Sequence, residues 1–278
     1  MKGIDVYTGD GIIDWKKVST SDVGFAMIKA TQGYLVANPK SGMFTDSKFE
    51  YNITNATDNG IKCGVYHYIM AKTVENAKAE AKYFVSKILP FKDRITLFAA
   101  VDMENDKAKK YARDEKKLNT NILLAFCEIV EKAGFKSAIY INPNFIKYYL
   151  EFDRLAGKNI WLARWCDDRT VRSYIESFKD PSQFKIWQYG KASVPGIKKE
   201  TDGDIALQIF VENDSFKPGD RVKIIGDRYY NGVLIPDSIK KIHWIVSSVN
   251  GDRVVINKSA DGKRSINSAV DVKDLRKC

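Results

Sequence analysis

The first 210 residues alternate between short apolar runs and longer segments with helical periodicity. A short apolar run bounded by turn residues has the length of a buried strand, whereas apolar positions that recur every three or four residues mark one face of a helix. The strand-like runs are residues 3–7, 25–30, 64–69, 96–102, 137–141, 159–165, 184–189 and 205–210. The main helix-like segments are 47–59, 74–88, 118–133 and 143–155. This alternation predicts an α/β fold, a modified (β/α)8-type barrel whose last third is less regular because its connections are shorter.

The pattern changes near the end of this region. Residues 211–215 are a short polar segment, and the alternating faces of 216–225 then read as a turn and a strand, with no helical periodicity afterwards. The tight-turn signals are Asn-Gly at 231–232, Asn-Gly at 250–251 and Asp-Gly at 261–262. We therefore expect two domains, 1–210 and 211–278, the second a small all-β barrel.

The composition and charge of the chain restrict the cellular compartment and the binding partners that we expect for it. The 278 residues carry a net charge of +10, and the basic residues are scattered. A solubilising surface explains this charge, and a general attraction to polyanions such as bacterial cell wall or nucleic acid is the functional alternative. The chain has no apolar run of membrane-spanning length, and its N-terminus meets Asp5 before any apolar signal region. We expect no membrane segment and a protein made in the cytosol without classical export.

Cysteine and histidine usage argues against a metal centre. The cysteines are Cys63, Cys127, Cys166 and Cys278. Their spacing is not that of metal ligands, so we expect free thiols in a reducing compartment. Because His67 and His243 are the only histidines, a His-based zinc site is not expected, and no cofactor is implied. We expect His67 to be a structural hydrogen-bonding group.

Two carboxylates mark the end of one buried strand. The apolar run 96–102 ends in Asp102, and Glu104 follows two residues later. Since residues i and i+2 of a strand point to the same side, these side chains are expected to project together. Such acids often cap a helix or pair with lysine, but Asp5 lies inside a second apolar run, 3–7. Two apolar strands that carry acids predict one acidic cleft, with the parts needed to cleave a glycosidic bond.

Other polar residues end neighbouring predicted strands. In (β/α)8 barrels the chemistry lies at the carboxyl ends of the strands. The residues at these ends are Lys29, Tyr68, Trp165 and Gln188. We expect these side chains to line the same cleft.

Six segments of the first domain, taken in order, resemble one family. They are GIDV at 3–6, IKATQG at 28–33, GVYHY at 64–68, VDME at 101–104, IWLARW at 160–165 and IWQY at 186–189. Together they resemble the glycoside hydrolase family 25 lysozymes, also called Chalaropsis-type muramidases. The resemblance implies hydrolysis of the β-1,4 bond between N-acetylmuramic acid and N-acetylglucosamine in bacterial peptidoglycan. The alternative is a catalytically silent protein that binds cell-wall carbohydrate.

The resemblance also implies roles for the acids. Glu104 would be the general acid/base and must hold its proton near neutral pH. Asp102 would be either the nucleophile or the group that orients the acetamido of the substrate, and Asp5 would also lie in the cleft. Tyr68, Trp165 and Tyr189 are candidates for stacking on sugar faces, with core packing as the alternative.

A fourth acid in this family lies in a loop before the last strand. The matching loop is 201–205, where Asp202 fits better than Asp204. Many members continue with V-D-L-N, whereas this chain reads IALQ at 205–208. The choice between the two aspartates therefore stays open.

The second domain resembles bacterial SH3-like cell-wall-binding modules. The segments that carry this resemblance are 216–225, 230–236, 249–256 and 274–275. A muramidase joined to such a module is the layout of a bacteriophage endolysin. This implies a protein that waits in the cytoplasm of a Gram-positive host until a holin opens the membrane, then binds a wall polymer and cleaves peptidoglycan.

Two other functions fit only part of the sequence. A nucleic-acid-binding protein would use the basic charge, but it leaves the acidic cleft unexplained. A family 18 chitinase would need aspartates where this chain has Leu97 and Ala100. The apolar run 241–246 is either an edge strand through which the second domain forms a homodimer, or a strand whose Ile242 and Trp244 fill the core.

Overall fold

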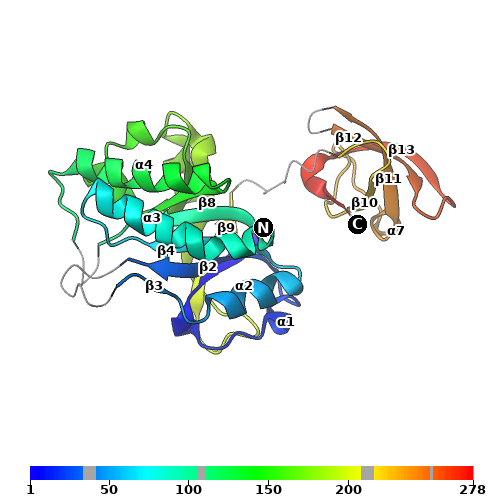
Figure 1. Ribbon diagram of the computed structural model, residues 1–278. Coiled ribbons are helices and arrows are strands. Elements are labelled where there is room, and N and C mark those ends of the chain that lie inside the picture. The colour runs from blue at the N-terminus through cyan, green and yellow to red at the C-terminus, as the bar shows by residue number, and fades with distance from the viewer. Residues whose placement is uncertain (34–41, 106–109, 208–215, 251–252, 278) are drawn as a thin grey trace. The chain divides into compact units, whose positions relative to one another are not determined.

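The chain divides into two compact units, Met1–Gln208 and Ile209–Cys278. The structure is a computed structural model that describes residues 1–33, 42–105, 110–207, 216–250 and 253–277 (Figure 1). The expected domain boundary at 210 lies outside these residues. No helix within the described ranges combines the length and the apolar character needed to cross a bilayer.

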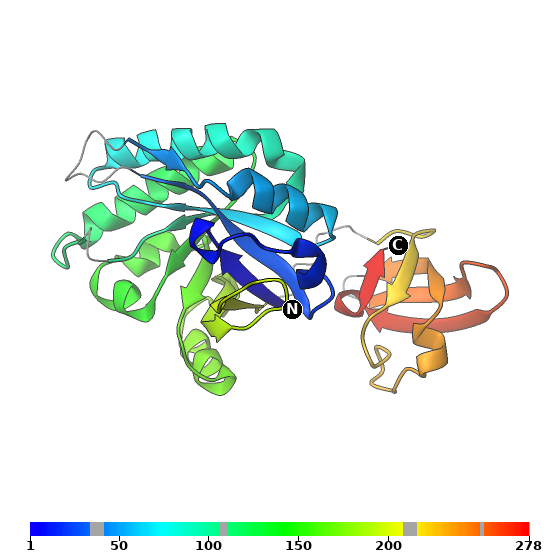
Figure 2. The ribbon, with the colours of Figure 1, turned by 90° about the horizontal axis from the view of Figure 1, so that it is seen from below.

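Eight strands of the described residues close the first unit into a barrel. They are β1 (Lys2–Val6), β2 (Val23–Gln32), β4 (Lys62–Tyr68), β5 (Ile95–Asp102), β6 (Lys136–Ile141), β7 (Asn159–Ala163), β8 (Phe184–Ala192) and β9 (Thr201–Ala206). They pair in chain order, and β9 returns to β1, which also pairs with β2 (Figure 2). A short strand, β3 (Phe44–Thr45), pairs with the end of β2. The first seven barrel strands are parallel, as the alternation predicts.

The last barrel strand differs from the prediction. It spans Thr201–Ala206 rather than 205–210, and it runs antiparallel to both β8 and β1. An antiparallel return needs only a short connection, whereas a parallel one needs a crossover of a dozen or more residues. Residues 201–205 are therefore strand and not loop.

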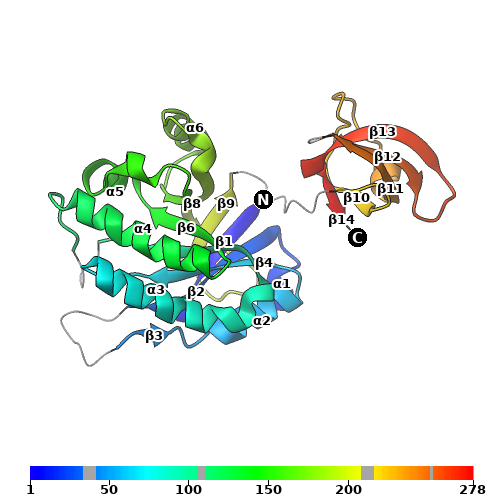
Figure 3. The ribbon, with the colours of Figure 1, turned by 45° about the horizontal axis from the view of Figure 1, so that its top comes forward.

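Helices cover the outside of the barrel. They are α1 (Trp15–Val18), α2 (Phe49–Asp58), α3 (Val74–Ile88), α4 (Lys116–Lys132), α5 (Pro143–Tyr148) and α6 (Asp168–Glu176). Among the described residues, 3-10 turns accompany them: η1 (Thr8–Asp10), η3 (Leu89–Arg94), η4 (Phe152–Leu155) and η5 (Pro181–Gln183). The bounds of α3 match the prediction, and Thr73 caps it by accepting from Asn76 N at 3.2 Å. Helices α3 and α4 lie side by side (Figure 3).

The predicted helix 143–155 is split into α5 and η4. Between them, Asn119 of α4 donates to the Tyr149 carbonyl at 3.0 Å, and Thr120 accepts from Glu151 N at 2.9 Å. Because α4 supplies these partners, the backbone between 148 and 152 has no need of helical hydrogen bonds.

Because alternate residues of a strand point to opposite sides, the barrel strands contribute to two apolar layers, one outside the barrel and one inside it. Outward residues such as Ile4 and Val65 pack against the helices, while inward residues such as Met27 fill the barrel. Gly64 makes room for this filling, since a Cβ there would lie 2.4 Å from Met27 Sδ. The barrel interior is thus a packed core.

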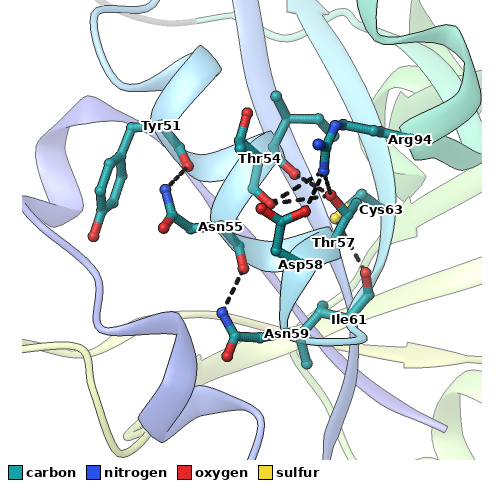
Figure 4. A network of polar contacts seen from close by, with 10 residues as sticks. Tyr51, Thr54, Asn55, Thr57, Asp58, Asn59, Ile61, Cys63 and Arg94 are labelled. Atoms are coloured by element: carbon teal, nitrogen blue, oxygen red, sulfur yellow. Dashed lines mark hydrogen bonds and ion pairs between the residues drawn. The ribbon is translucent and has the colours of Figure 1, made fainter.

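A polar network joins the end of α2 to the end of η3, beside the start of β4 (Figure 4). Arg94, at the end of η3, donates to Thr57 Oγ1 and Asp58 Oδ1 at 2.6 Å each. Cys63, at the start of β4, is buried and donates to the Ile61 carbonyl. Burial raises the pKa of the Cys63 thiol, so it stays protonated. The expectation of free thiols is confirmed for three cysteines, and Cys278 lies outside the described residues.

The second unit is a five-stranded antiparallel sheet in its described residues. The elements are β10 (Arg221–Ile224), α7 (Asp237–Lys240), β11 (His243–Asn250), β12 (Arg253–Ser259), β13 (Ser265–Asp271), η6 (Val272–Asp274) and β14 (Leu275–Lys277). The order across the sheet is β13, β12, β11, β10, β14. Gly232 and Gly262 have φ of +84° and +70°, as the turn signals predict, and Gly251 lies outside the described residues.

Of the two alternatives for 241–246, the edge strand is wrong. Strand β11 pairs with β10 on one side and β12 on the other, so its backbone groups are used within the sheet. Trp244 is fully buried in the core of this unit, and its Nε1 donates to the Ile239 carbonyl at 3.0 Å. The apolar run fills the core, which removes the ground for a homodimer through this strand.

Candidate active site

A pocket of about 170 Å³ opens at the carboxyl ends of the parallel strands. Its lining residues are Asp5, Tyr7, Lys29, Tyr66, Tyr68, Asp102, Glu104, Tyr140, Trp161, Gln188 and Asp202. Every barrel strand contributes at least one of them. Because β9 runs antiparallel, its first residues lie at the same mouth as the last residues of the other strands.

Asp102 and Glu104 enter the pocket together. Asp102 is the last residue of β5 and pairs in register with Tyr68 of β4 and Tyr140 of β6. Its carbonyl accepts from Ile69 N at 3.1 Å, and Met103 N donates to the Tyr140 carbonyl at 3.3 Å. Met103 turns outward into the core, which leaves the acids on either side of it facing the pocket. Asp102 is buried, and Glu104 is half-buried.

Asp5 forms the opposite wall. Its Oδ2 accepts from Gln188 Nε2 at 3.0 Å, and its carbonyl accepts from Thr201 Oγ1 at 2.9 Å. Burial, followed by the charge of Asp202, raises the pKa of Asp5 to about 7. Asp5 therefore changes charge near neutral pH, where other aspartates are fully ionised.

Gln188 hydrogen-bonds to residues of the pocket wall and to one residue at the rim. Its Oε1 accepts from the Tyr140 hydroxyl at 3.1 Å and from Trp165 Nε1 at 3.3 Å, while its amide donates to Asp5. Trp165 is not in the pocket wall itself. Its indole is 61% exposed, beside the mouth.

The two candidate fourth acids have different surroundings. Asp202 lines the pocket and forms an ion pair with Lys191 at 2.6 Å. Asp204 is fully buried, and its Oδ1 accepts from Trp161 Nε1 at 2.8 Å. Burial, followed by the charge of Asp5, raises the pKa of Asp204 well above its usual value. Asp202 is thus the acid that a ligand in the pocket would meet.

Lys29 reaches the mouth between two phenol rings. Its Nζ donates to Gln32 Oε1 at 2.7 Å and lies 4.9 Å from the ring centroid of Tyr68 and 5.8 Å from that of Tyr7. Such cation–π contacts hold the ammonium in place. Tyr7 is 44% exposed and offers a free ring surface at the rim.

Besides Trp165 and Asp204, two more residues named from the sequence lie outside the pocket lining. Tyr189 follows Gln188 on the other side of β8 and packs edge-on against Trp187 at 5.9 Å between ring centroids. His67 is fully buried on the outer side of β4, where Thr31 Oγ1 and Glu80 Oε2 lie 2.7 and 2.8 Å from its ring nitrogens. His67 is structural, as expected.

Phenols and carboxylates dominate the electrostatics of the pocket. Burial, followed by the nearby aspartates, raises the pKa values of Tyr66 and Tyr140 well above the usual value. Both hydroxyls therefore remain protonated. That of Tyr140 already donates to Gln188 Oε1, so that of Tyr66 is the one that can donate a hydrogen bond to a ligand. Within the described residues, no cluster of three or more His, Cys, Asp or Glu side chains is arranged to hold a metal ion.

The comparison with protein families agrees with this arrangement. The sequence model of the glycosyl hydrolases family 25 matches residues 4–197, which include Asp5, Asp102 and Glu104. The chain belongs to glycosyl hydrolase family 25. Most of the first unit is covered by the match, and the second unit lies outside it.

Two curated proteins are similar to this family 25 chain. Lysozyme M1 of Streptomyces globisporus is 26% identical over 210 residues, which are 74% of this chain and 66% of that protein. An autolytic lysozyme of Clostridium acetobutylicum is 27% identical over 165 residues, 59% of this chain and 45% of that protein. The chain thus spans between about half and two thirds of the length of these relatives.

The fold is also shared with solved structures. The CTP1L endolysin superposes with a TM-score of 0.58 at 24% identity, covering 76% of this chain and 67% of that one. A spore cortex lytic enzyme of Clostridium perfringens, SleM, has a TM-score of 0.60 at 17% identity, covering 97% of this chain and 86% of that one. These likenesses concern the fold.

Sequence reasoning missed four lining residues of this family 25 site. They are Tyr7, Tyr66, Tyr140 and Trp161. Strand alternation holds the signal, because each lies on the same side of its strand as a polar residue or glycine that faces the barrel interior. Tyr7, for example, lies two residues beyond Asp5.

Proposed function

We propose that this family 25 chain is a lysozyme, an N-acetylmuramidase that hydrolyses the β-1,4 bond between N-acetylmuramic acid and N-acetylglucosamine in peptidoglycan. One observation carries the proposal: Asp5, Asp102, Glu104 and Asp202 meet in one pocket of a glycosyl hydrolase barrel. Two carboxyl groups on either side of a glycosidic bond suffice for its acid-catalysed cleavage.

The positions of two acids support distinct roles. Glu104 is half-buried beyond the end of β5, where it can reach the glycosidic oxygen and give it a proton. Asp102 lies deeper, in register with Tyr68 and Tyr140. There it either attacks the anomeric carbon or steadies the acetamido oxygen of the substrate. Asp5 and Asp202 supply negative charge opposite the developing oxocarbenium ion.

The rim offers surfaces for the neighbouring sugars. Tyr7 and Trp165 are exposed beside the mouth, and Tyr68 lies in its wall. Aromatic rings of this kind stack on the apolar faces of pyranose rings. Lys29 and Gln188 add hydrogen-bond donors between them. This combination suits a neutral sugar backbone that carries acetamido and lactyl groups.

The second unit is proposed to hold the enzyme on its substrate. Its antiparallel sheet and buried Trp244 fit an SH3-like module that binds a wall polymer of a Gram-positive host. On this proposal the chain acts as a bacteriophage endolysin, stored in the host cytoplasm until a holin opens the membrane. Binding of nucleic acid or membrane has no part in it.

Purified Gram-positive cell walls test the activity. We expect the turbidity of the suspension to fall, and the new reducing ends to be N-acetylmuramic acid. Glu104→Gln is the matched inactive protein, with the exposed Glu75→Gln as the control. Wall binding without new reducing ends would instead identify a silent carbohydrate-binding protein.

A further inference from the structure

Asp204 is a fully buried carboxyl to which the cleavage chemistry gives no task. In β9 it pairs in register with Gly3 of β1 on one side and with Gln188 of β8 on the other. Its side chain is 0% exposed, whereas Asp202, two residues earlier, reaches the pocket. A carboxyl withdrawn from water needs either a cation or a proton. Lys191, on the neighbouring strand, is paired with Asp202.

The hydrogen bonds of Asp204 show where a proton must be. Its Oδ1 accepts from Trp161 Nε1 at 2.8 Å, and its carboxyl also hydrogen-bonds to that of Asp5. Two carboxyl groups share a hydrogen bond only when one of them is protonated. Asp5 already accepts from Gln188, and no N–H or O–H of the described residues donates to Asp204 Oδ2. This buried oxygen is therefore the place where a proton would be held, and from there it can be donated to Asp5.

We propose that Asp204 is a positioning residue, which stays protonated and holds Asp5 and Trp161 in place against the pocket. One of its oxygens accepts from the indole of Trp161 while the other donates to Asp5. Both partners line the pocket, although Asp204 does not. A shift of Asp204 would thus move two groups that touch the substrate.

The surrounding charges favour the protonated form. The titratable and charged groups that face the pair are Asp10, Tyr66, Tyr140, Tyr189, Lys191 and Asp202. Burial and the nearby aspartates raise the pKa of Asp204 well above its usual value, so the proton remains at neutral pH. Once Asp5 ionises, near pH 7, the pair presents one negative charge to the pocket instead of two.

Two substitutions test whether Asp204 acts as a neutral hydrogen-bond donor or as an ionised carboxylate. Asn can accept from Trp161 through its oxygen and donate to Asp5 through its amide, so Asp204→Asn should keep kcat within about threefold. Leu has a similar branched shape, although it is larger, and it offers neither bond. Asp204→Leu should lower kcat roughly 10- to 100-fold with a smaller change in KM. Equal loss in both variants, or wild-type kcat in Asp204→Leu, would overturn the proposal.

The proton itself has a readout that does not depend on cleavage. An infrared difference spectrum of wild type minus Asp204→Asn at neutral pH should contain the C=O stretch of one protonated carboxyl. Asp46→Asn is the control, since the two oxygens of the buried Asp46 accept from Thr8 N and Lys48 N. Absence of the band from the Asp204→Asn difference, or an equal band in the control, contradicts a protonated Asp204.

The effect on kcat rests on the proposed function, whereas the infrared band does not. If the wild-type protein fails to cleave cell walls, the proposed function fails and the band still decides the state of Asp204. The band also decides the protonation state of Asp204 if the Asp204→Leu variant does not fold.

Discussion

Asp5 and Asp202 lie opposite each other in the antiparallel pairing of β1 with β9, where the barrel closes. The first strand supplies one acid from near its end, and the last strand supplies the other from near its beginning. They meet because β9 runs against the other seven strands. A parallel last strand would have placed residues 201–204 at the far end of the barrel, away from Asp102 and Glu104.

Glu104→Gln should abolish lysis and leave the fold intact. Gln cannot deliver a proton to the leaving oxygen, and loss of this step should lower the rate about a thousandfold or more. Turbidity loss of purified walls measures the rate, and circular dichroism checks the fold. Near-wild-type lysis by the pure variant would show that another group is the acid.

Cleavage should retain the configuration at the anomeric carbon. Asp102 and Glu104 face the pocket from positions two residues apart, which favours the separation of about 5 Å found in retaining enzymes over the wider gap that admits a water. NMR of the first product should show the β anomer before mutarotation. A covalent adduct trapped on Asp102 would identify it as the nucleophile rather than the partner of the acetamido group. An initial α anomer would mean that water attacks directly.

Because of Asp5, we expect the free energy of unfolding to fall as the pH rises. Unfolded aspartate ionises near pH 4, whereas buried Asp5 keeps its proton until about pH 7. Between these values the native state binds more protons, so the free energy of unfolding falls with increasing pH. Asp5→Asn has no carboxyl group to ionise and avoids this loss. Relative to wild type, its free energy of unfolding should rise by at least about 1 kcal/mol between pH 4.5 and pH 8. Urea unfolding of both proteins at both pH values measures this change. The same difference in free energy of unfolding between variant and wild type at pH 4.5 and at pH 8 would refute the prediction.

The two units should separate in function. Each has its own buried apolar core. The piece 1–210 should cleave isolated peptidoglycan, and 211–278 should bind host walls without cleaving them. Co-sedimentation measures the binding. A folded second piece that stays in the supernatant would contradict the wall-binding role.

Trp244→Ala should unfold the second unit alone. The side chain is fully buried in a small core, and removing it should cost about 3–5 kcal/mol. Exposed Leu234→Ala serves as the stability control. We expect wall binding to be lost while peptidoglycan cleavage by the first unit persists. Unchanged thermal unfolding of the second unit would show that Trp244 does not support its core.

Much of the site could be predicted because its signals are local. Asp102, Glu104 and Asp5 stand out as charges in apolar runs, and strand periodicity places Lys29 and Gln188 at strand ends. The aromatic members could not be recognised in this way. An inward Tyr or Trp looks the same in sequence whether it fills a core or lines a pocket.

The sequence by itself determined the strand and helix alternation, the change of pattern near residue 210 and the acids of the pocket, because periodicity and charge are read along the chain. Only the tertiary structure decided the direction of β9, the central place of β11 and the different surroundings of Asp202 and Asp204. The physical reason is that strand direction, pairing and burial depend on residues distant in sequence. Asp202 and Asp204 are both acids of one short segment, yet one meets the pocket and the other meets Trp161 and Asp5.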